Sequence, residues 1–163
     1  MESVFSNSTV QLNAVLTIVL AAILGGAIGL ERELVDKPVG IKTMMIVAGT
    51  SAMLMLLGIM LAESTTLEVT DEIRSDPSRI IQAIVTGIGF IGAGTILRHS
   101  RGEHIEGLTT AATILLAAAI GICVALHQFI MAVCTTAFVV LILIVVRRLE
   151  TWLHAMRDSH NSD

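Results

Sequence analysis

Five long apolar runs, separated by short polar segments, constrain this chain more than any other feature of its sequence. Each run is about as long as the α-helix that crosses ~30 Å of hydrocarbon at a rise of ~1.5 Å per residue. The chain is therefore predicted to be all-α, a polytopic membrane bundle of five transmembrane helices. The predicted helices are residues 12–30, 41–62, 80–97, 108–126 and 129–146.

The length of the chain leaves little room for anything besides these spans. It has 163 residues, of which 54% are hydrophobic. We therefore expect a single transmembrane domain over residues 1–163, with a short cytoplasmic tail at 147–163. The first apolar run follows a segment without Lys or Arg, and Glu31-Arg32-Glu33 stands where a signal peptide would have its small-residue cleavage site. This run is therefore predicted to be a retained span.

The basic residues predict the orientation of the bundle. If the N-terminus is outside, only Arg74 and Arg79 of the ten Lys and Arg residues lie outside, and the other eight are cytoplasmic. Such an excess of positive charge marks the cytoplasmic side of membrane proteins. The sequence thus predicts the N-terminus outside and the C-terminus inside. The eight cytoplasmic residues are Arg32, Lys37, Lys42, Arg98, Arg101, Arg147, Arg148 and Arg157.

The predicted third helix has a clear start signal. It follows an acidic segment at residues 63–76, expected outside the membrane. Asp76 is a favourable N-cap, and Pro77 at the first helical position costs no hydrogen bond. Asp76 and Arg79 are three residues apart, so they are expected to pair at this helix start.

The last two spans are separated only by His127 and Gln128, which predicts a tight helical hairpin. Beyond residue 146, Leu149 and Trp152 continue at helical spacing. We therefore expect the last helix to extend into the membrane interface as an amphipathic end.

Glycines are concentrated in the first and third spans, where they predict close helix packing. Gly25 and Gly29 form a GxxxG pair, which allows two helix backbones to approach closely in lipid. We expect the first and third helices to pack through their glycine faces. The alternative is a broken third helix whose exposed carbonyl groups bind an ion. The third-span glycines are Gly87, Gly89, Gly92 and Gly94.

A set of polar residues gathers at the predicted cytoplasmic ends of the first four helices. One interpretation is a solvated rim, because charges at the ends of spans can reach water. The other is a partly buried functional network in which Arg32 or Arg98 pairs with Glu31, because buried charges need partners. The set comprises Glu31, Arg32, Lys42, Thr43, Arg98, Thr109 and Thr110.

The sequence gives no indication of an enzyme. It has no HExxH motif, no phosphate-binding loop and no plausible Ser/His/Asp set. The histidines lie in predicted loops or in the tail, where solvation is a better explanation than metal binding. No basic, aromatic stripe suggests nucleic-acid binding. We therefore expect no catalysis, no cofactor and no nucleic-acid partner, and the question of a bound metal stays open.

Five motifs, in a fixed order, extend this interpretation to a known family. They are Gly29-Leu30-Glu31-Arg32-Glu33, Gly40-Ile41-Lys42-Thr43, Asp76-Pro77-Ser78-Arg79, the glycine-rich run from Gly87 to Gly94, and Gly107-Leu108-Thr109-Thr110-Ala111-Ala112. With these motifs the chain resembles the MgtC/SapB family of bacterial inner-membrane proteins over about residues 12–148. The resemblance implies an inner-membrane location and a link to growth in low magnesium, virulence and restraint of the proton-driven ATP synthase. Many members carry a soluble C-terminal domain, so the chain is expected to be a short form that lacks it.

Two functions compete on this basis. The leading prediction is a regulatory or stress-adaptive membrane protein that acts by helix contacts, either with itself as a homodimer or with another membrane complex. The alternative is a transporter or channel for a small ion, such as a divalent cation. The acidic outer segment and the glycine-rich third helix favour transport, whereas the middles of all five runs lack the ionisable residues that mark a conduction path.

Overall fold

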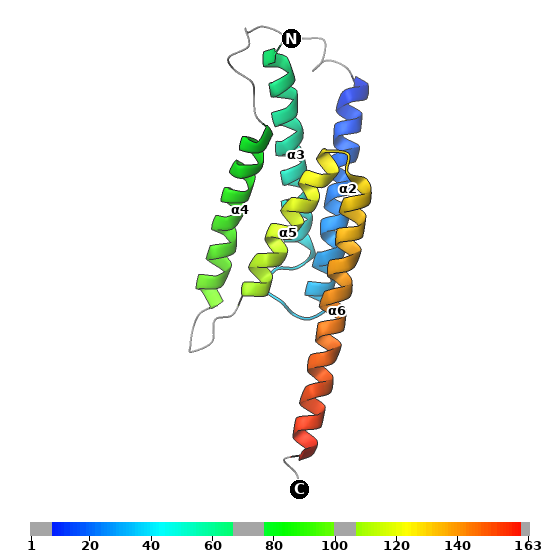
Figure 1. Cartoon of the computed structure of the whole chain (residues 1–163), viewed down its shortest axis with the longest axis vertical. Coiled ribbons are helices and arrows are strands. Elements are labelled where there is room, and N and C mark those ends of the chain that lie inside the picture. The colour runs from blue at the N-terminus through cyan, green and yellow to red at the C-terminus, as the bar shows by residue number, and fades with distance from the viewer. Residues whose placement is uncertain (1–7, 67–76, 100–106, 161–163) are drawn as a thin grey trace.

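A computed structural model of the protein describes residues 8–66, 77–99 and 107–160. These residues form five helices and no strand, and every helix is long and apolar enough to cross a membrane (Figure 1). The prediction of an all-α chain with five candidate spans is thus confirmed, and the orientation of the termini stays a prediction. The helices are α2 (Ser8–Glu33), α3 (Ile41–Thr66), α4 (Pro77–His99), α5 (Leu108–Ala125) and α6 (Phe129–His160).

Four of the five helices run past the predicted apolar segments, and α5 ends one residue before its predicted end. The largest difference is in α6, which has 32 residues and continues well beyond residue 146. Its C-terminal part projects past the ends of the other helices (Figure 1). The residues after 146 are good helix formers without Gly or Pro, so the loss of hydrophobicity there does not end the helix. The expected helical extension of the last span is confirmed.

The shortest helix, α5, is at the centre of the bundle and contacts each of the other four. Over half of its span is buried (56%), against 11% for the spans of α4 and α6. Many of its positions are Ala or Gly, and small side chains let neighbouring backbones approach closely in a membrane protein. The composition of α5 therefore suits its central position.

Three glycines lie where two helices touch. A Cβ atom added at Gly25 would lie 2.5 Å from the Met44 carbonyl oxygen, and one at Gly29 would lie 2.5 Å from the Ile41 Cα atom. Both contacts join α2 to α3. A Cβ atom at Gly121 of α5 would collide with a backbone carbonyl oxygen of α3. The backbone of α3 is thus held close to α2 on one side and to α5 on another.

The expectation that the first and third predicted spans pack together is wrong. Among the described residues α2 and α4 make no contact, because the GxxxG pair of α2 packs against α3 instead. The connection from α2 to α3 is short, and sequential elements joined in this way are usually neighbours. In α4, Gly92 lies against Ala111 of α5, whereas a Cβ atom at Gly87, Gly89 or Gly94 would meet nothing within 4 Å.

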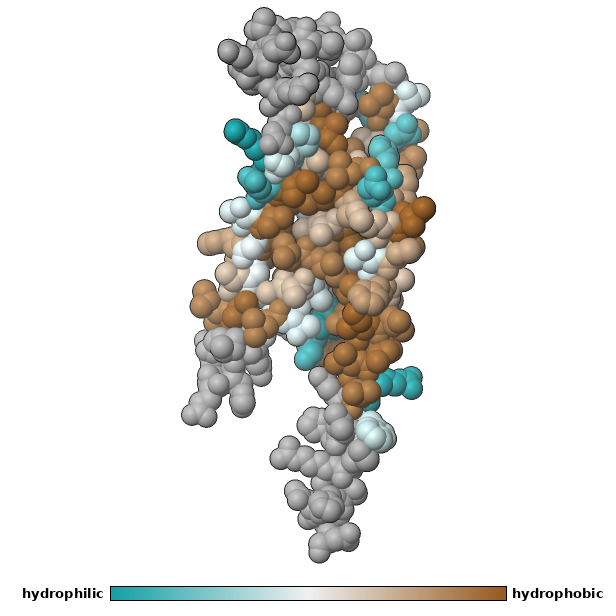
Figure 2. Space-filling model, in the orientation of Figure 1, coloured by the Kyte–Doolittle hydropathy of each residue, from teal (hydrophilic) through white to brown (hydrophobic). Residues whose placement is uncertain are grey.

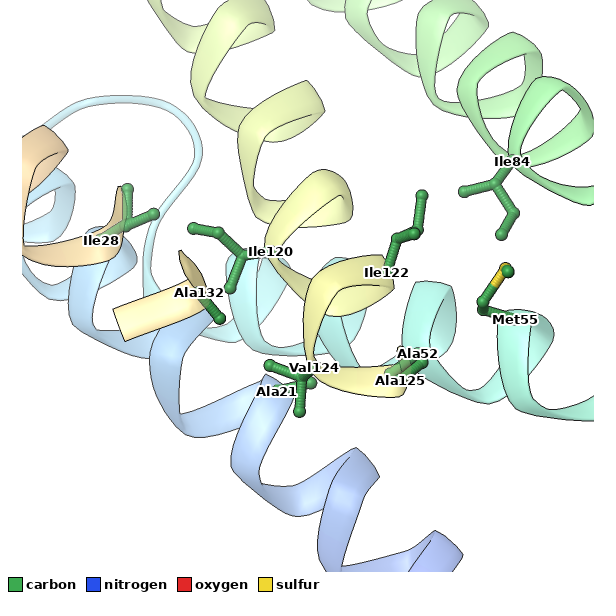
Figure 3. Packing of buried hydrophobic residues seen from close by; sticks show 10 residues of the cluster. All are labelled: Ala21, Ile28, Ala52, Met55, Ile84, Ile120, Ile122, Val124, Ala125 and Ala132. Atoms are coloured by element: carbon green, nitrogen blue, oxygen red, sulfur yellow. The ribbon is translucent and has the colours of Figure 1, made fainter. Parts of the chain in front are cut away.

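The core is apolar and is shared by all five helices. Its larger cluster includes Ala21 of α2, Met55 of α3, Ile84 of α4 and Ala132 of α6, together with several residues of α5. Figure 3 shows Ile84 and Met55 directed toward one another beside α5. Hydrophobic side chains also cover much of the described surface in the middle of the molecule (Figure 2). A surface of this kind fits hydrocarbon rather than water.

Two helix ends have the same hydrogen-bonded termination, the Schellman motif. After α2, the Lys37 N–H donates to the Arg32 carbonyl (3.1 Å) and the Asp36 N–H to the Glu33 carbonyl (3.2 Å). Asp36 adopts the left-handed conformation that this motif requires, with φ 52°. This ending fixes the direction in which the chain leaves α2, next to two buried charged residues.

The same motif ends α5 and forms the hairpin to α6. The Gln128 N–H donates to the Cys123 carbonyl (2.9 Å) and the His127 N–H to the Val124 carbonyl (3.0 Å). His127 is left-handed, with φ 58°. The predicted tight hairpin between the last two spans is confirmed.

Candidate functional site

The last turn of α2 buries two charged side chains. Glu31 is 8% exposed and Arg32 is 5% exposed. Charged residues are almost never this buried unless they are paired. They lie where α2 ends and α5 begins, which we call the α2/α5 end of the bundle.

Arg32 joins the two helices at this end. Its Nη2 atom donates a hydrogen bond of 3.0 Å to the Oγ1 atom of Thr110, a residue 78 positions later in the chain. Thr110 is the third residue of α5 and is only 2% exposed. The Thr113 hydroxyl in turn donates to the Thr110 carbonyl (2.9 Å). Arg32 is therefore held against the first turn of α5.

Two atoms of these buried side chains lack a hydrogen-bond partner among the described residues. They are Oε2 of Glu31 and Nε of Arg32, both inaccessible to solvent. A buried polar atom without a partner is costly, and such atoms are rare in folded proteins. The α2/α5 end thus contains one acidic and one basic group with unused bonding capacity.

The start of α5 adds further hydrogen-bond donors. Its N-cap is Gly107, which has no side chain to bond the first turn, and the first helical bond runs from the Ala111 N–H to the Gly107 carbonyl (2.8 Å). The N–H groups of Leu108, Thr109 and Thr110 precede this bond and have no place in the helical pattern. The N-terminal end of a helix also carries a partial positive charge. Gly107 has φ 92°, a conformation that suits glycine.

Glu33 is a functional candidate that the sequence prediction missed. Its Oε2 atom accepts a 2.9 Å hydrogen bond from the backbone N–H of Ile41, the first residue of α3. No Ser, Thr, Asp or Asn directly precedes α3, where Pro38-Val39-Gly40 stands. The missing capping residue is visible in the sequence. It indicates that the first turn of α3 needs a hydrogen-bond acceptor from elsewhere in the chain. Glu33 supplies it and fixes the α2–α3 turn.

The remaining predicted polar residues are more dispersed. Lys42 and Thr43 lie exposed at the start of α3, and Thr109 is exposed beside the buried Thr110. Of the predicted set, the structure brings Arg32 and Thr110 into contact and buries Glu31 next to Arg32. The Arg98 side chain lies outside the described residues.

The expected Asp76–Arg79 pair cannot be placed, because Asp76 lies outside the described residues. Arg79 is exposed in the first turn of α4, which begins at Pro77 as expected. The described residues contain no group of three or more His, Cys, Asp or Glu side chains that could hold a metal ion.

A second feature is a groove between α3 and α4. It encloses about 470 Å³ and its walls are almost entirely apolar. Val47 and Ser51 contribute from α3, and Ile84, Gly87 and Ile88 from α4. No motif in the sequence indicates this groove, because it depends on how far α4 stands from α3.

Known bacterial proteins are similar in sequence to this chain over most of its length. It is 38% identical over 136 residues to a protein of Escherichia coli K12 named "Putative magnesium transporter YhiD", which covers 83% of this chain and 61% of that one. It is 45% identical over 103 residues to Protein SapB of Bacillus subtilis, covering 63% and 43%. Protein MgtC of Salmonella typhimurium is 36% identical over 125 residues, covering 77% and 48%.

The chain spans between two fifths and about three fifths of the length of these curated relatives. No solved structure matches it. Its five apolar helices and its bacterial relatives make it a multi-pass protein of the bacterial inner membrane. The sequence profile of the MgtC family matches residues 18–152, and the chain belongs to that family.

Proposed function

We propose that the protein is a regulatory or stress-adaptive membrane protein linked to magnesium limitation, and that it acts by helix contacts made through α4. The observation that carries this proposal is that α4, of whose span only 11% is buried, carries glycines with open space around them. The link to magnesium comes from the name of the Escherichia coli relative and from the family resemblance.

The face of α4 beside the groove suits a second helix. Gly87 lines the groove and has open space around it. Gly94 is seven residues later, on the same side of the helix, and is equally open. Small residues at such spacing let another backbone approach, which favours helix association in lipid. We propose a second copy of the chain as the partner, since symmetric pairs are the commonest assemblies.

Two substitutions distinguish the loss of this contact from a general destabilisation of α4. Gly87→Leu should block the approach of a second helix, whereas Gly89→Leu places the same side chain about 200° around the helix. Both glycines are open within the chain. We expect Gly87→Leu to lower the dimer fraction, measured by particle mass in nanodiscs, and Gly89→Leu to leave it unchanged. A wild-type protein that is entirely monomeric would contradict the homodimer.

The physiological part of the proposal is tested by growth at limiting magnesium. A strain lacking the gene should recover with the wild-type protein and with Gly89→Leu, but not with Gly87→Leu. Equal rescue by both variants would show that the α4 contact is not needed for adaptation.

Transport of a small cation is the second candidate. The buried Glu31 carboxylate favours it, because Oε2 has no partner among the described residues and could bind a cation. Against it, the central parts of the spans carry no ionisable side chain, whereas ion pathways usually do. Purified protein in liposomes should show no protein-dependent magnesium flux, and a saturable flux abolished by Glu31→Gln would establish transport instead.

A further inference from the structure

We propose that the α2/α5 end binds a phosphoethanolamine group, the zwitterionic head group of phosphatidylethanolamine. The phosphate would be bound by Arg32 and the first turn of α5, and the ammonium by Glu31. This inference goes beyond the proposed function and does not depend on it, because the groups proposed to bind the ligand belong to α2 and α5, whereas the proposed partner contact uses the open glycines of α4.

The phosphate half of the site combines two independent features. The first is the start of α5, where three backbone N–H groups precede the first helical bond and the N-cap has no side chain. Helix starts of this kind bind phosphate groups. The second is Arg32, which is 5% exposed, has an unpartnered Nε, and lies against this same turn through its bond to Thr110. Guanidinium groups suit phosphate oxygens in both charge and geometry.

Arg32 lies between two helix ends that act on it in opposite ways. The last turn of α2 favours a cation, whereas the positive N-terminal end of α5 disfavours one. Arg32 is also buried, with part of its bonding capacity unused. An anion between Arg32 and the α5 N–H groups would turn this repulsion into attraction on both sides.

Glu31 determines which kind of phosphate compound fits. Glu31 is buried and adjoins Arg32 in the last turn of α2, so its carboxylate would repel a simple anion at this end of the bundle. A ligand with an ammonium group beside its phosphate removes this conflict, because the ammonium can donate to the unpartnered Oε2. A primary ammonium has N–H donors for this bond, whereas the quaternary ammonium of choline has none.

The position of the site agrees with this ligand. The apolar spans of α2 and α5 end and begin here, so this end of the bundle lies at a boundary of the hydrocarbon, where lipid head groups are found. Basic pockets between membrane helices are known as head-group sites. The same group could also come from a soluble phosphoethanolamine, and the experiment separates the two sources.

The test measures lipid retention by the purified protein. Delipidated protein is given equimolar phosphatidylethanolamine, phosphatidylcholine and phosphatidylglycerol with identical acyl chains, and bound lipid is counted by native mass spectrometry. We expect phosphatidylethanolamine to be retained about tenfold better than phosphatidylcholine, the factor expected from one charge-assisted hydrogen bond. Equal retention of the two lipids would overturn the proposal.

Three variants test separately whether Arg32 binds the phosphate and whether Glu31 binds the ammonium. Arg32→Gln should lower retention of phosphatidylethanolamine and of phosphatidylglycerol about tenfold, because both use the phosphate half. Glu31→Gln should abolish the preference for phosphatidylethanolamine over phosphatidylglycerol without lowering phosphatidylglycerol retention. Lys37→Gln is the control, because it removes one positive charge from an exposed residue of the adjoining turn. If Arg32→Gln does not fold, Glu31→Gln decides alone, and an unchanged preference in it would refute the site.

Soluble compounds identify the source of the ligand. In detergent without lipid, phosphoethanolamine should raise the unfolding temperature more than equal concentrations of inorganic phosphate or phosphocholine if the head group alone is recognised. If only the lipid shows the ethanolamine preference, the natural ligand is the lipid. Equal shifts for all three soluble compounds, together with equal lipid retention, would overturn the assignment.

Discussion

Gly121 shows how much a single residue controls in this bundle. Its missing side chain allows the backbone of α5 to touch the backbone of α3, and an added Cβ atom would collide with the Ala48 carbonyl oxygen. Backbone atoms cannot move aside as a flexible side chain can. The close approach of α3 and α5 therefore depends on glycine at position 121.

We expect Gly121→Ala to destabilise the protein by about 1–3 kcal/mol, the usual cost of overpacking a tight contact. Gly89→Ala is the matched control, because its added methyl group meets nothing within 4 Å and it lies away from the proposed contact face of α4. There the better helix propensity of Ala should leave stability unchanged or raise it by up to ~1 kcal/mol. Unfolding in detergent followed by circular dichroism measures both. Equal shifts for the two variants would contradict the close α3–α5 contact.

Thr110 and Thr109 allow a similar comparison at the α2/α5 end. Thr110→Val removes the acceptor for Arg32 Nη2 while keeping the shape of the side chain, so a buried donor is left unpaired. We expect a loss of about 1–3 kcal/mol. Thr109→Val changes an exposed neighbour and should have little effect. If the same unfolding assay finds the two variants equally stable, the Arg32–Thr110 bond does not hold α2 to α5.

At the element scale, two helices end with a residue that is unusual for its backbone conformation. Both Schellman motifs place a non-glycine residue at the left-handed position, Asp36 after α2 and His127 after α5. Such positions usually hold glycine, because other residues are strained there. The strain is smaller for Asp and His than for most side chains.

His127→Gly should therefore stabilise the α5–α6 hairpin by up to ~1 kcal/mol, and His127→Val should destabilise it by at least as much, because a β-branched side chain suits this conformation least. Thermal unfolding of the two variants in the same detergent provides the comparison. A lower midpoint for His127→Gly would mean that the histidine side chain, and not the backbone, stabilises the turn.

Sequence patterns predicted which segments are helices but not which helices meet. The length of an apolar run and the Pro77 start signal are local, so the five elements were found. The GxxxG pair of α2 correctly indicates a close contact but carries no information about the partner, which is α3 and not α4. Likewise, the groove between α3 and α4 depends on the distance between helices, which no short motif encodes.

The candidate site was predictable in part, for a similar reason. The placement of Glu31, Arg32 and Thr110 at helix ends follows from the order of spans and loops. Their burial does not, because it requires knowing that α2 and α5 converge there. The capping bond of Glu33 was missed because its partner, the Ile41 N–H, is a backbone group with no side-chain signature.

For the whole molecule, the orientation is the prediction with the widest consequences. With the N-terminus outside, the α2/α5 end faces the cytoplasm, and so does the projecting end of α6. Reporter fusions at Ser8, Thr70 and Asp163 test this. We expect an external signal from the first two and a cytoplasmic signal from the third, because positively charged segments stay inside. A cytoplasmic signal at Thr70 would show that the bundle has the opposite orientation.

The short α5 also affects the lipid around the protein. Its 18-residue apolar span extends only ~27 Å, less than the ~30 Å of a typical hydrocarbon layer, whereas the 22-residue apolar span of α3 extends ~33 Å. The turn after α5 correspondingly lies well short of the ends of α2 and α3 (Figure 1). A bilayer of uniform thickness cannot match both lengths, so it must be thinner beside the α5–α6 hairpin than beside α3. Thinning the bilayer at this one place costs free energy, and the cost rises with the thickness of the surrounding membrane.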